Sequence, residues 1–220
     1  MKKQIGFFLI LAGSLLAQTP EIVTAAFEKV NADTVHQYRF KKSVRASDNT
    51  QILQYDPTQE GSDCWQLISV NDQPPDKNQL REFYKEMSKN GKDSNKSLSF
   101  DTKDMKDFLL LQETSKIMEY AFAINGDEDD KMAENLKCSL CINKSDTTIN
   151  RIAMLLTEPV SPMISVKIDE FRVEMVFDKI AETGSTLIKE TQTRIKGKAM
   201  VFKEIDENVT EKYFDYQLVE

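Results

Sequence analysis

Histidine is almost absent from this chain, and the residues that enzymes use as nucleophiles form no recognisable motif. His36 is the single histidine in 220 residues. General-base catalysis, catalytic triads and histidine-ligated metals need an imidazole that a specific partner orients, so an isolated histidine excludes most of them. Carboxylates are abundant, but neighbours such as Asp169 and Glu170 point to opposite faces of a strand. We therefore expect a binding protein without catalytic residues or a cofactor, and not an enzyme.

Cysteine is also scarce. The chain has three, Cys64, Cys138 and Cys141, which permit at most one internal disulfide. Cys138 and Cys141 form a C-x-x-C pattern inside a segment with strand periodicity, where residues three apart stand ~10 Å apart, beyond the ~7 Å that a disulfide tolerates. We predict that these two are not paired with each other, that Cys138 is a small core residue, and that Cys141 faces outward. Cys64 could pair with either, and too few thiols remain for a zinc site.

Long apolar runs are missing beyond the first seventeen residues. Two lysines precede an apolar run over residues 5–16, which ends in small residues at Ala17. This pattern is typical of a cleavable secretory signal peptide, and the run is shorter than the ~20 residues of a membrane-spanning helix. Ser14 stands where a bacterial lipoprotein signal would carry its lipid-accepting cysteine. We predict a signal peptide over residues 1–17, a periplasmic location, and one domain over residues 18–220 without stable membrane insertion.

Excess positive charge is missing as well. Removal of the leader takes away two of the 29 basic residues and none of the 36 acidic ones, which leaves a formal charge of −9. A nucleic-acid partner needs a clustered basic face, and anionic membrane surfaces are disfavoured for the same reason. The acidic segment Asp127–Asp130 lacks the loop spacing of a calcium-binding hand, so solvated charge is the simpler interpretation and no metal site is expected.

The first half of the chain alternates helical and strand patterns. Thr19 and Pro20 predict a helix start with a hydroxyl cap, followed by an apolar stripe from Ile22 to Val30. A period of two from His36 then predicts a hairpin, and Trp65–Val70 a third strand. Asp76, with glutamine three residues later, resembles a capping box that opens a second amphipathic helix.

The second half is a series of strand patterns joined by short polar turns. A hairpin is expected over residues 108–124, followed by strands at about residues 136–143, 149–157, 163–178, 186–195, 198–204 and 208–218. In the longest of these, the apolar alternation of Ile164, Val166 and Ile168 is shifted by one residue from that of the apolar residues that begin at Phe171. This shift predicts a bulge at Asp169-Glu170. Together the patterns predict an α+β fold with an antiparallel sheet of about ten strands that curves around its helices.

Several short segments resemble a known family. They are Tyr55-Asp56-Pro57, Trp65–Val70, Pro74-Pro75, Pro159–Pro162 and Gly197–Lys203. In this order the chain resembles the periplasmic lipoprotein-carrier superfamily, and more closely a group of uncharacterised exported bacterial proteins. The resemblance implies an incomplete β-barrel covered by two or three helices, with an apolar space between them that accepts acyl chains.

The preferred hypothesis is an exported soluble protein that holds a lipid or another amphiphile between the sheet and its helices. The alternative is an envelope component that docks a protein partner and has a filled core, and neither hypothesis involves nucleic acid. The candidate lining consists of large apolar residues from both halves of the chain: Phe27, Tyr38, Phe40, Trp65, Leu67, Phe83, Met118, Tyr120, Phe122, Met154, Phe171, Val173, Met175 and Phe177.

Overall fold

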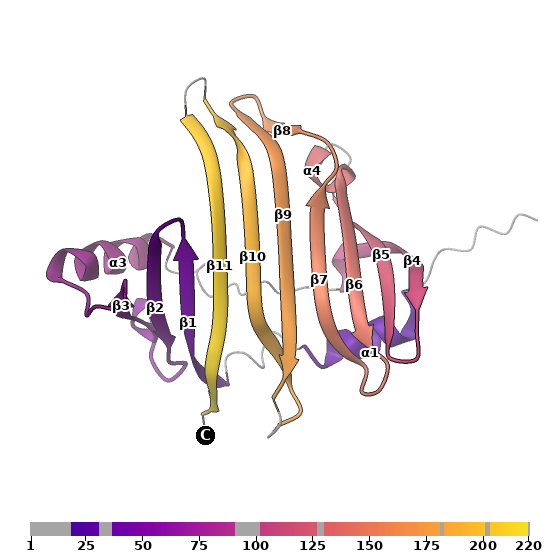
Figure 1. The fold of residues 1–220 in the computed structure, drawn as a ribbon, viewed down its shortest axis with the longest axis horizontal. Helices are drawn as coiled ribbons and strands as arrows, with labels where there is room; N and C mark the ends of the chain where they lie inside the picture. The colour runs from indigo at the N-terminus through magenta and orange to yellow at the C-terminus, as the bar shows by residue number, and fades with distance from the viewer. Residues whose placement is uncertain are drawn as a thin grey trace, which may run out of the picture.

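In the described part of the chain, eleven strands pair into one antiparallel sheet, which is open and does not close into a barrel (Figure 1). The computed structural model describes residues 19–30, 37–90, 102–126, 130–180, 183–200 and 203–219. The predicted α+β fold with a large antiparallel sheet is confirmed. The predicted signal peptide and most of the acidic segment lie outside the described residues.

The strand order is β3-β2-β1-β11-β10-β9-β7-β6-β5-β4, with β8 paired to β9 beside this path. The first hairpin therefore joins the last strand, because β1 pairs with β11. The strands are β1 Tyr38–Ala46, β2 Asn49–Tyr55, β3 Trp65–Val70, β4 Met105–Glu113, β5 Ile117–Ile124, β6 Leu136–Asn143, β7 Thr148–Leu156, β8 Val160–Met163, β9 Val166–Lys179, β10 Thr186–Ala199 and β11 Lys203–Leu218.

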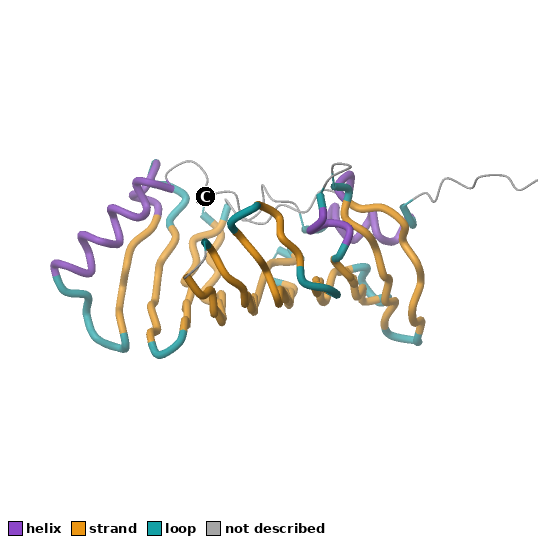
Figure 2. Tube along the Cα trace, turned by 90° about the horizontal axis from the view of Figure 1, so that it is seen from above, coloured by secondary structure: helices purple, strands orange, loops and turns teal. Residues whose placement is uncertain are grey.

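The described helices all lie on one side of the sheet, which we call the inner face. Figure 2 shows both ends of the sheet rising toward that side, with α3 (Lys77–Asn90) over one end and α1 (Glu21–Glu28) and α4 (Lys131–Glu134) over the other. No helix among the described residues is long and apolar enough to cross a bilayer.

The predicted N-terminal cap is present in α3 and absent in α1. The capping box before α3 is confirmed: the Asp76 amide donates to Gln79 Oε1 at 2.8 Å, and the Gln79 amide donates to Asp76 Oδ1 at 2.9 Å. The predicted hydroxyl cap of α1 is wrong. Pro20 is the N-cap and no side chain caps this helix, although the Pro20 carbonyl accepts from the Val23 amide at 2.9 Å.

The longest predicted strand contains a break and a bulge. The bulge is confirmed, because β10 pairs Lys196 with Glu170 and the next residue with Ile168, so Asp169 is the extra residue. The segment is nevertheless two strands, β8 and β9, and Ile164 lies in the turn between them, fully exposed. Its predicted place on the face of Val166 and Ile168 is therefore wrong.

The predicted strand boundaries after residue 186 also need correction. The strand expected at residues 186–195 is instead the longer strand β10, which continues to Ala199, and Met200 follows it with φ 54°. β11 then runs from Lys203 to Leu218 and absorbs the last predicted strand. The glycine between the two expected strands, Gly197, stays inside the ladder opposite Ile168.

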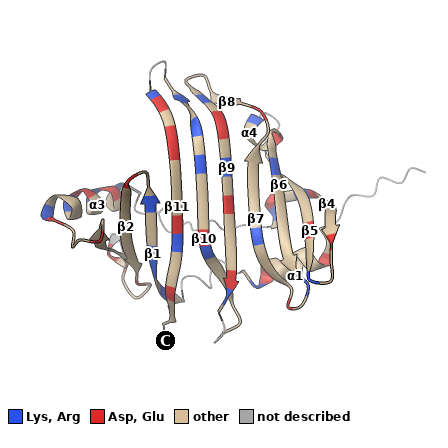
Figure 3. Cartoon of the chain, viewed as in Figure 1, with Lys and Arg blue, Asp and Glu red and all other residues tan. Residues whose placement is uncertain are grey.

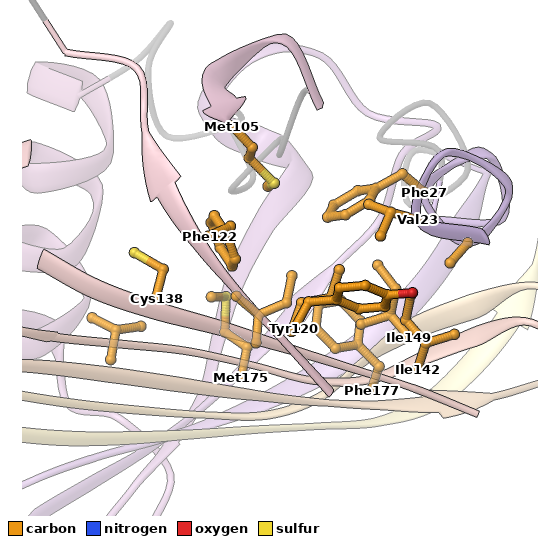
Figure 4. Close-up of a cluster of buried hydrophobic side chains, with 14 residues drawn as sticks. Val23, Phe27, Met105, Tyr120, Phe122, Cys138, Ile142, Ile149, Met175 and Phe177 are labelled. Atoms are coloured by element: carbon orange, nitrogen blue, oxygen red, sulfur yellow. The ribbon is translucent and has the colours of Figure 1, made fainter. Parts of the chain in front are cut away.

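Two apolar clusters fill the two ends of the inner face. The larger one packs α1 against β5, β6, β7 and β9, and Figure 4 shows Val23 and Phe27 of the helix facing Tyr120, Ile149 and Phe177 of the sheet. The smaller one packs α3 against β1, β2 and β3. Its buried members are Phe40, Leu53, Tyr55, Cys64, Trp65, Leu67, Val70 and Phe83.

All three cysteines are buried. Cys138 is in the larger cluster, as predicted, and Cys64 is in the smaller one. Cys141, which was predicted to face outward, belongs to neither apolar cluster, and only 7% of the residue is exposed. Cys141 lies between Glu119 and Arg151 in the ladder, and their ion pair of 3.0 Å crosses the strand above it.

The outer face carries most of the charge of the central strands. Figure 3 shows Lys and Arg interspersed with Asp and Glu along β9, β10 and β11. Arg151 approaches Glu174 at 3.9 Å, Glu174 accepts from Arg172 at 2.9 Å, and Arg194 pairs with residues on both neighbouring strands. Charge on one face and apolar residues on the other follow from the period of two along each strand.

Candidate functional site

The inner face brings all fourteen predicted lining residues to one side of the sheet but divides them between its two ends. Nine belong to or pack against the cluster under α1: Phe27, Met118, Tyr120, Phe122, Met154, Phe171, Val173, Met175 and Phe177. Four belong to the cluster under α3: Phe40, Trp65, Leu67 and Phe83. Tyr38 is buried between the two sets.

The middle of the inner face is a half-buried strip over which none of the described helices lies (Figure 2). Its apolar side chains come from β1, β11 and β10, where Val44, Val209 and Ile195 are all intermediate in exposure. Thr193 lies in the same strip, paired with Val209 on one side and Val173 on the other. The strip thus connects the two apolar clusters across the central strands.

A group of polar side chains interrupts this strip; we call Lys42, Glu211, Tyr213 and Thr191 the central polar cluster. Lys42 Nζ donates to Glu211 Oε1 at 2.8 Å, and the Tyr213 hydroxyl donates to Glu211 Oε2 at 3.0 Å. The Lys42 ammonium also lies over the rings of Trp65 and Tyr213, at 5.1 and 5.7 Å from their centroids. These contacts hold a half-buried charge pair between two apolar regions.

The fourth member of this cluster has spare hydrogen-bonding capacity. Thr191 pairs with Glu211 in the ladder and is 3% exposed. Its hydroxyl adjoins Tyr213 and slightly lowers the pKa of that phenol, but no described group meets hydrogen-bond geometry with its oxygen. Burial and the neighbouring Glu211 carboxylate nevertheless raise the pKa of Tyr213 well above 10.0, so the phenol stays protonated.

Tyr216 joins the two ends of the inner face. Its hydroxyl donates to the Ile188 carbonyl at 2.7 Å, and its ring meets Tyr38 edge-on at 6.0 Å and Phe40 at 5.3 Å. Burial raises the pKa of this phenol too. Tyr38 in turn shares a hydrogen bond of 2.6 Å with Thr183, beyond the cluster under α1.

Sequence reasoning missed Tyr213, Tyr216 and the Lys42–Glu211 pair. Strict alternation places residues 213 and 216 on opposite faces, but β11 has an irregularity opposite Phe40, where Asp215 adopts φ 56°. The extra residue returns Tyr216 to the inner face. Aspartate tolerates this conformation better than most residues, which was a weak signal in the sequence.

Grooves border the sheet at two places among the described residues. One of about 340 Å³ lies between α3 and the strands β2 and β3, and two predicted lining residues, Leu67 and Phe83, form part of its wall. The other, of about 640 Å³, crosses β4 to β9 mainly on the outer face, over the small residues Ala121, Ser139 and Ala153. Among the described residues, no group of three or more His, Cys, Asp or Glu side chains could hold a metal ion.

No protein-family model and no curated protein matches the chain. Among solved structures, it is similar to a LolA superfamily protein from Nitrosomonas europaea, with 13% identity and a TM-score of 0.39. The alignment covers 90% of this chain and 92% of that chain.

Proposed function

We propose that the protein is a non-catalytic binding protein that holds a single-chain amphiphile, such as a fatty acid, along the inner face. The observation that carries this proposal is the half-buried strip across β1, β11 and β10, which extends from Val44 on β1 to Thr193 on β10. An acyl chain laid there would remove apolar surface from water at about 25 cal/mol per Å². The central polar cluster then offers Lys42 and the Thr191 hydroxyl to the polar end of the molecule.

The proposal includes export. In this account residues 1–17 are a signal peptide cleaved near Ala17, and residues 18–220 act in the periplasm as one domain. A carrier of apolar cargo through an aqueous compartment needs a face that shields the cargo, and a sheet with helices at both ends provides one. Neither a resident cofactor nor a catalytic group is required for that task.

Filling the strip with a large side chain tests the proposal. Thr193→Trp places an indole on the inner face, and the matched control Gln192→Trp places one on the exposed outer face of the same strand. With anthroyloxy-labelled palmitate as probe, we expect wild type and Gln192→Trp to bind alike and Thr193→Trp to bind at least about tenfold more weakly, a change of ~1.4 kcal/mol. Both variants should keep the wild-type melting temperature.

Two results would overturn the proposal. One is a wild-type protein that does not bind the probe; the other is a folded Thr193→Trp variant that binds it as tightly as wild type. Mass spectrometry of the protein purified from a producing cell gives a second measurement, because a bound acyl compound should be present in wild type and depleted in Thr193→Trp. A partner protein captured equally by both variants, with no acyl compound in either, would favour the docking alternative.

A further inference from the structure

The edge strand β4 exposes three consecutive leucines. Leu109, Leu110 and Leu111 are 63%, 43% and 55% exposed. β4 is the last strand in the order of the sheet, and no strand among the described residues pairs with its free edge (Figure 1). Proteins commonly protect such an edge with charged side chains or proline, yet residues 108–112 contain neither. The middle of β4 is therefore accessible to another strand.

Two bulges limit which strand can pair with this edge. In its ladder with β5, β4 has two extra residues, Asp107 and Leu111. Asp107 adopts φ 56°, and Phe108 beyond it stacks on Phe122 of the inner face, with 5.7 Å between the ring centroids. The extra residues are placed symmetrically, one two residues before Leu109 and the other two residues after it. A regular partner strand would lose register at each of them.

A second copy of the chain carries its extra residues at matching positions. If two β4 strands pair antiparallel with Leu109 opposite Leu109, each Asp107 lies opposite a Leu111, so neither strand gains a residue on the other. Residues that oppose each other in an antiparallel pair share a face. The pairing meets this condition, because Leu109 is on the outer face in both copies and Phe108 opposes Leu110 on the inner face.

The charges of β4 are compatible with the same register. Lys106 would oppose Gln112, and Glu113 would oppose the methionine that begins the strand, so no two like charges face each other. Centring the pair on Leu110 would instead place Asp107 opposite Glu113, which are both acidic. The side chains therefore favour the pairing that is centred on the residue before Leu110.

We propose that β4 is the interface of a symmetric homodimer, in which two copies join into one continuous sheet through antiparallel β4 strands centred on Leu109. The main-chain groups of the two free edges supply hydrogen bonds, and each copy's exposed leucines cover Phe108 and Leu109 of the other. The twofold symmetry closes the assembly at two copies, since each has this edge only once. The dimer does not depend on the amphiphile proposed for the inner face, because several strands separate β4 from the half-buried strip.

Cysteine cross-linking tests both the pairing and its register. Residues that oppose each other in an antiparallel pair have Cα atoms ~4.5–5.5 Å apart, which a disulfide can bridge. We therefore expect Leu109→Cys to form a disulfide-linked dimer under mild oxidation. Lys106→Cys and Gln112→Cys should cross-link only when the two variants are mixed, because each of these residues would lie ~20 Å from its own copy.

Matched controls keep the cross-linking specific. Leu155→Cys changes a 47% exposed leucine on the same face, three strands from the edge, and should stay monomeric under the same oxidation. Wild type should also give no cross-link, because its three cysteines are buried. A cross-link in either control that equals that of Leu109→Cys would show that the disulfide does not report on the β4 edge.

Analytical ultracentrifugation tests the association without cross-linking. We expect wild type to dimerise as its concentration rises, and Leu109→Lys to raise the dimer Kd at least about tenfold, because two like charges then face each other on the symmetry axis. Leu155→Lys should dimerise like wild type. Thr193→Trp should also dimerise, which separates this result from the amphiphile proposal.

Four results would overturn the proposal. Wild type stays monomeric up to about 1 mM, or Leu109→Cys does not cross-link, or Lys106→Cys and Gln112→Cys do not cross-link when mixed, or Leu155→Lys weakens the dimer as much as Leu109→Lys does. A monomer that retains a different polypeptide, which Leu109→Lys releases, would assign the edge to another partner and would equally overturn it.

Discussion

Lys42 on β1 and Glu211 on β11 meet at 2.8 Å, 169 residues apart in the sequence. Their contact lies where the first hairpin joins the last strand, on the face that also carries both apolar clusters. The pair is substantially buried, with 17% and 25% of the two side chains exposed. One ion pair thus lies on the seam between the N- and C-terminal parts of the sheet.

Replacing Glu211 by Gln should destabilise the fold by about 1–2 kcal/mol, because the half-buried ammonium of Lys42 keeps its position but loses its charged partner. Urea unfolding measures the change. The control is Asp215→Asn, which breaks the more exposed Lys41–Asp215 pair of 3.0 Å on the same two strands and should cost less than about 1 kcal/mol. Equal losses in the two variants would contradict the role of burial.

The sequence predicts the individual strands well, but it does not predict the pairing of β1 with β11. Period-two runs located β5 and β6, and the shift in phase near Asp169 located the bulge in β9. These signals are carried by neighbours in the chain. The pairing of β1 with β11 joins segments far apart in the sequence. It depends on which strand edges remain unpaired once the intervening strands have formed, and the residues around Tyr38 and Leu218 show no sequence pattern that predicts it.

Asp56 should make the protein sensitive to acid. Hydrogen bonds from Thr58, and then from Arg39, hold the pKa of this carboxyl below its usual 3.8. Since the folded pKa is the lower one, the unfolded chain binds more protons, and the stabilising contribution is present above 3.8 and lost as pH falls through the folded value. Asp56→Asn should flatten this part of the stability profile.

Thr58→Val provides the control for the cause of that shift. It removes the hydroxyl that donates to Asp56 Oδ1 at 2.7 Å but leaves the Arg39 contact of 2.7 Å to Oδ2. NMR titration of the Asp56 carboxyl carbon should then give a higher pKa than in wild type. An unchanged value would show that the arginine alone sets it.

Cys138 should make the protein sensitive to alkali. Burial raises the pKa of this thiol from 9.0 to about 11. Between those values the unfolded chain loses the proton while the folded chain keeps it, so stability should fall as pH rises from 9 toward 11. Melting temperatures across this range should decline less steeply in Cys138→Ala.

The same burial predicts slow thiol chemistry. A protonated, buried thiol is a poor nucleophile, so native Cys138 and Cys141 should react with iodoacetamide far more slowly than in urea. Rapid labelling of Cys138 in the native protein would contradict the packing of the cluster under α1. Labelling sites are assigned by peptide mass spectrometry.

The residues of the candidate site were also predicted only in part, because the sequence pattern reports local structure. Large apolar residues at period two identified Phe171, Val173 and Met175 as inner-face residues, which the structure supports. Tyr213 and Tyr216 were missed because one irregular residue, Asp215, changes the phase of β11. A single bulge moves every later side chain to the other face, so alternation predicts a strand more reliably than it predicts which residues line a site.

Gly197→Ala should destabilise the protein more than an ordinary loop substitution does. The added β-carbon would meet the Lys167 carbonyl at 2.2 Å and Ile168 Cα at 3.0 Å, both backbone atoms that cannot rotate away. Overpacking of this kind costs about 1–3 kcal/mol, and relief requires β9 and β10 to separate at their bulge. The control, Gly61→Ala, adds a methyl group where nothing lies within 4 Å and pays only for a φ of +64°, about 1 kcal/mol. Urea unfolding should therefore rank Gly197→Ala below Gly61→Ala in stability, and the opposite order would show that the two strands are not held in contact there.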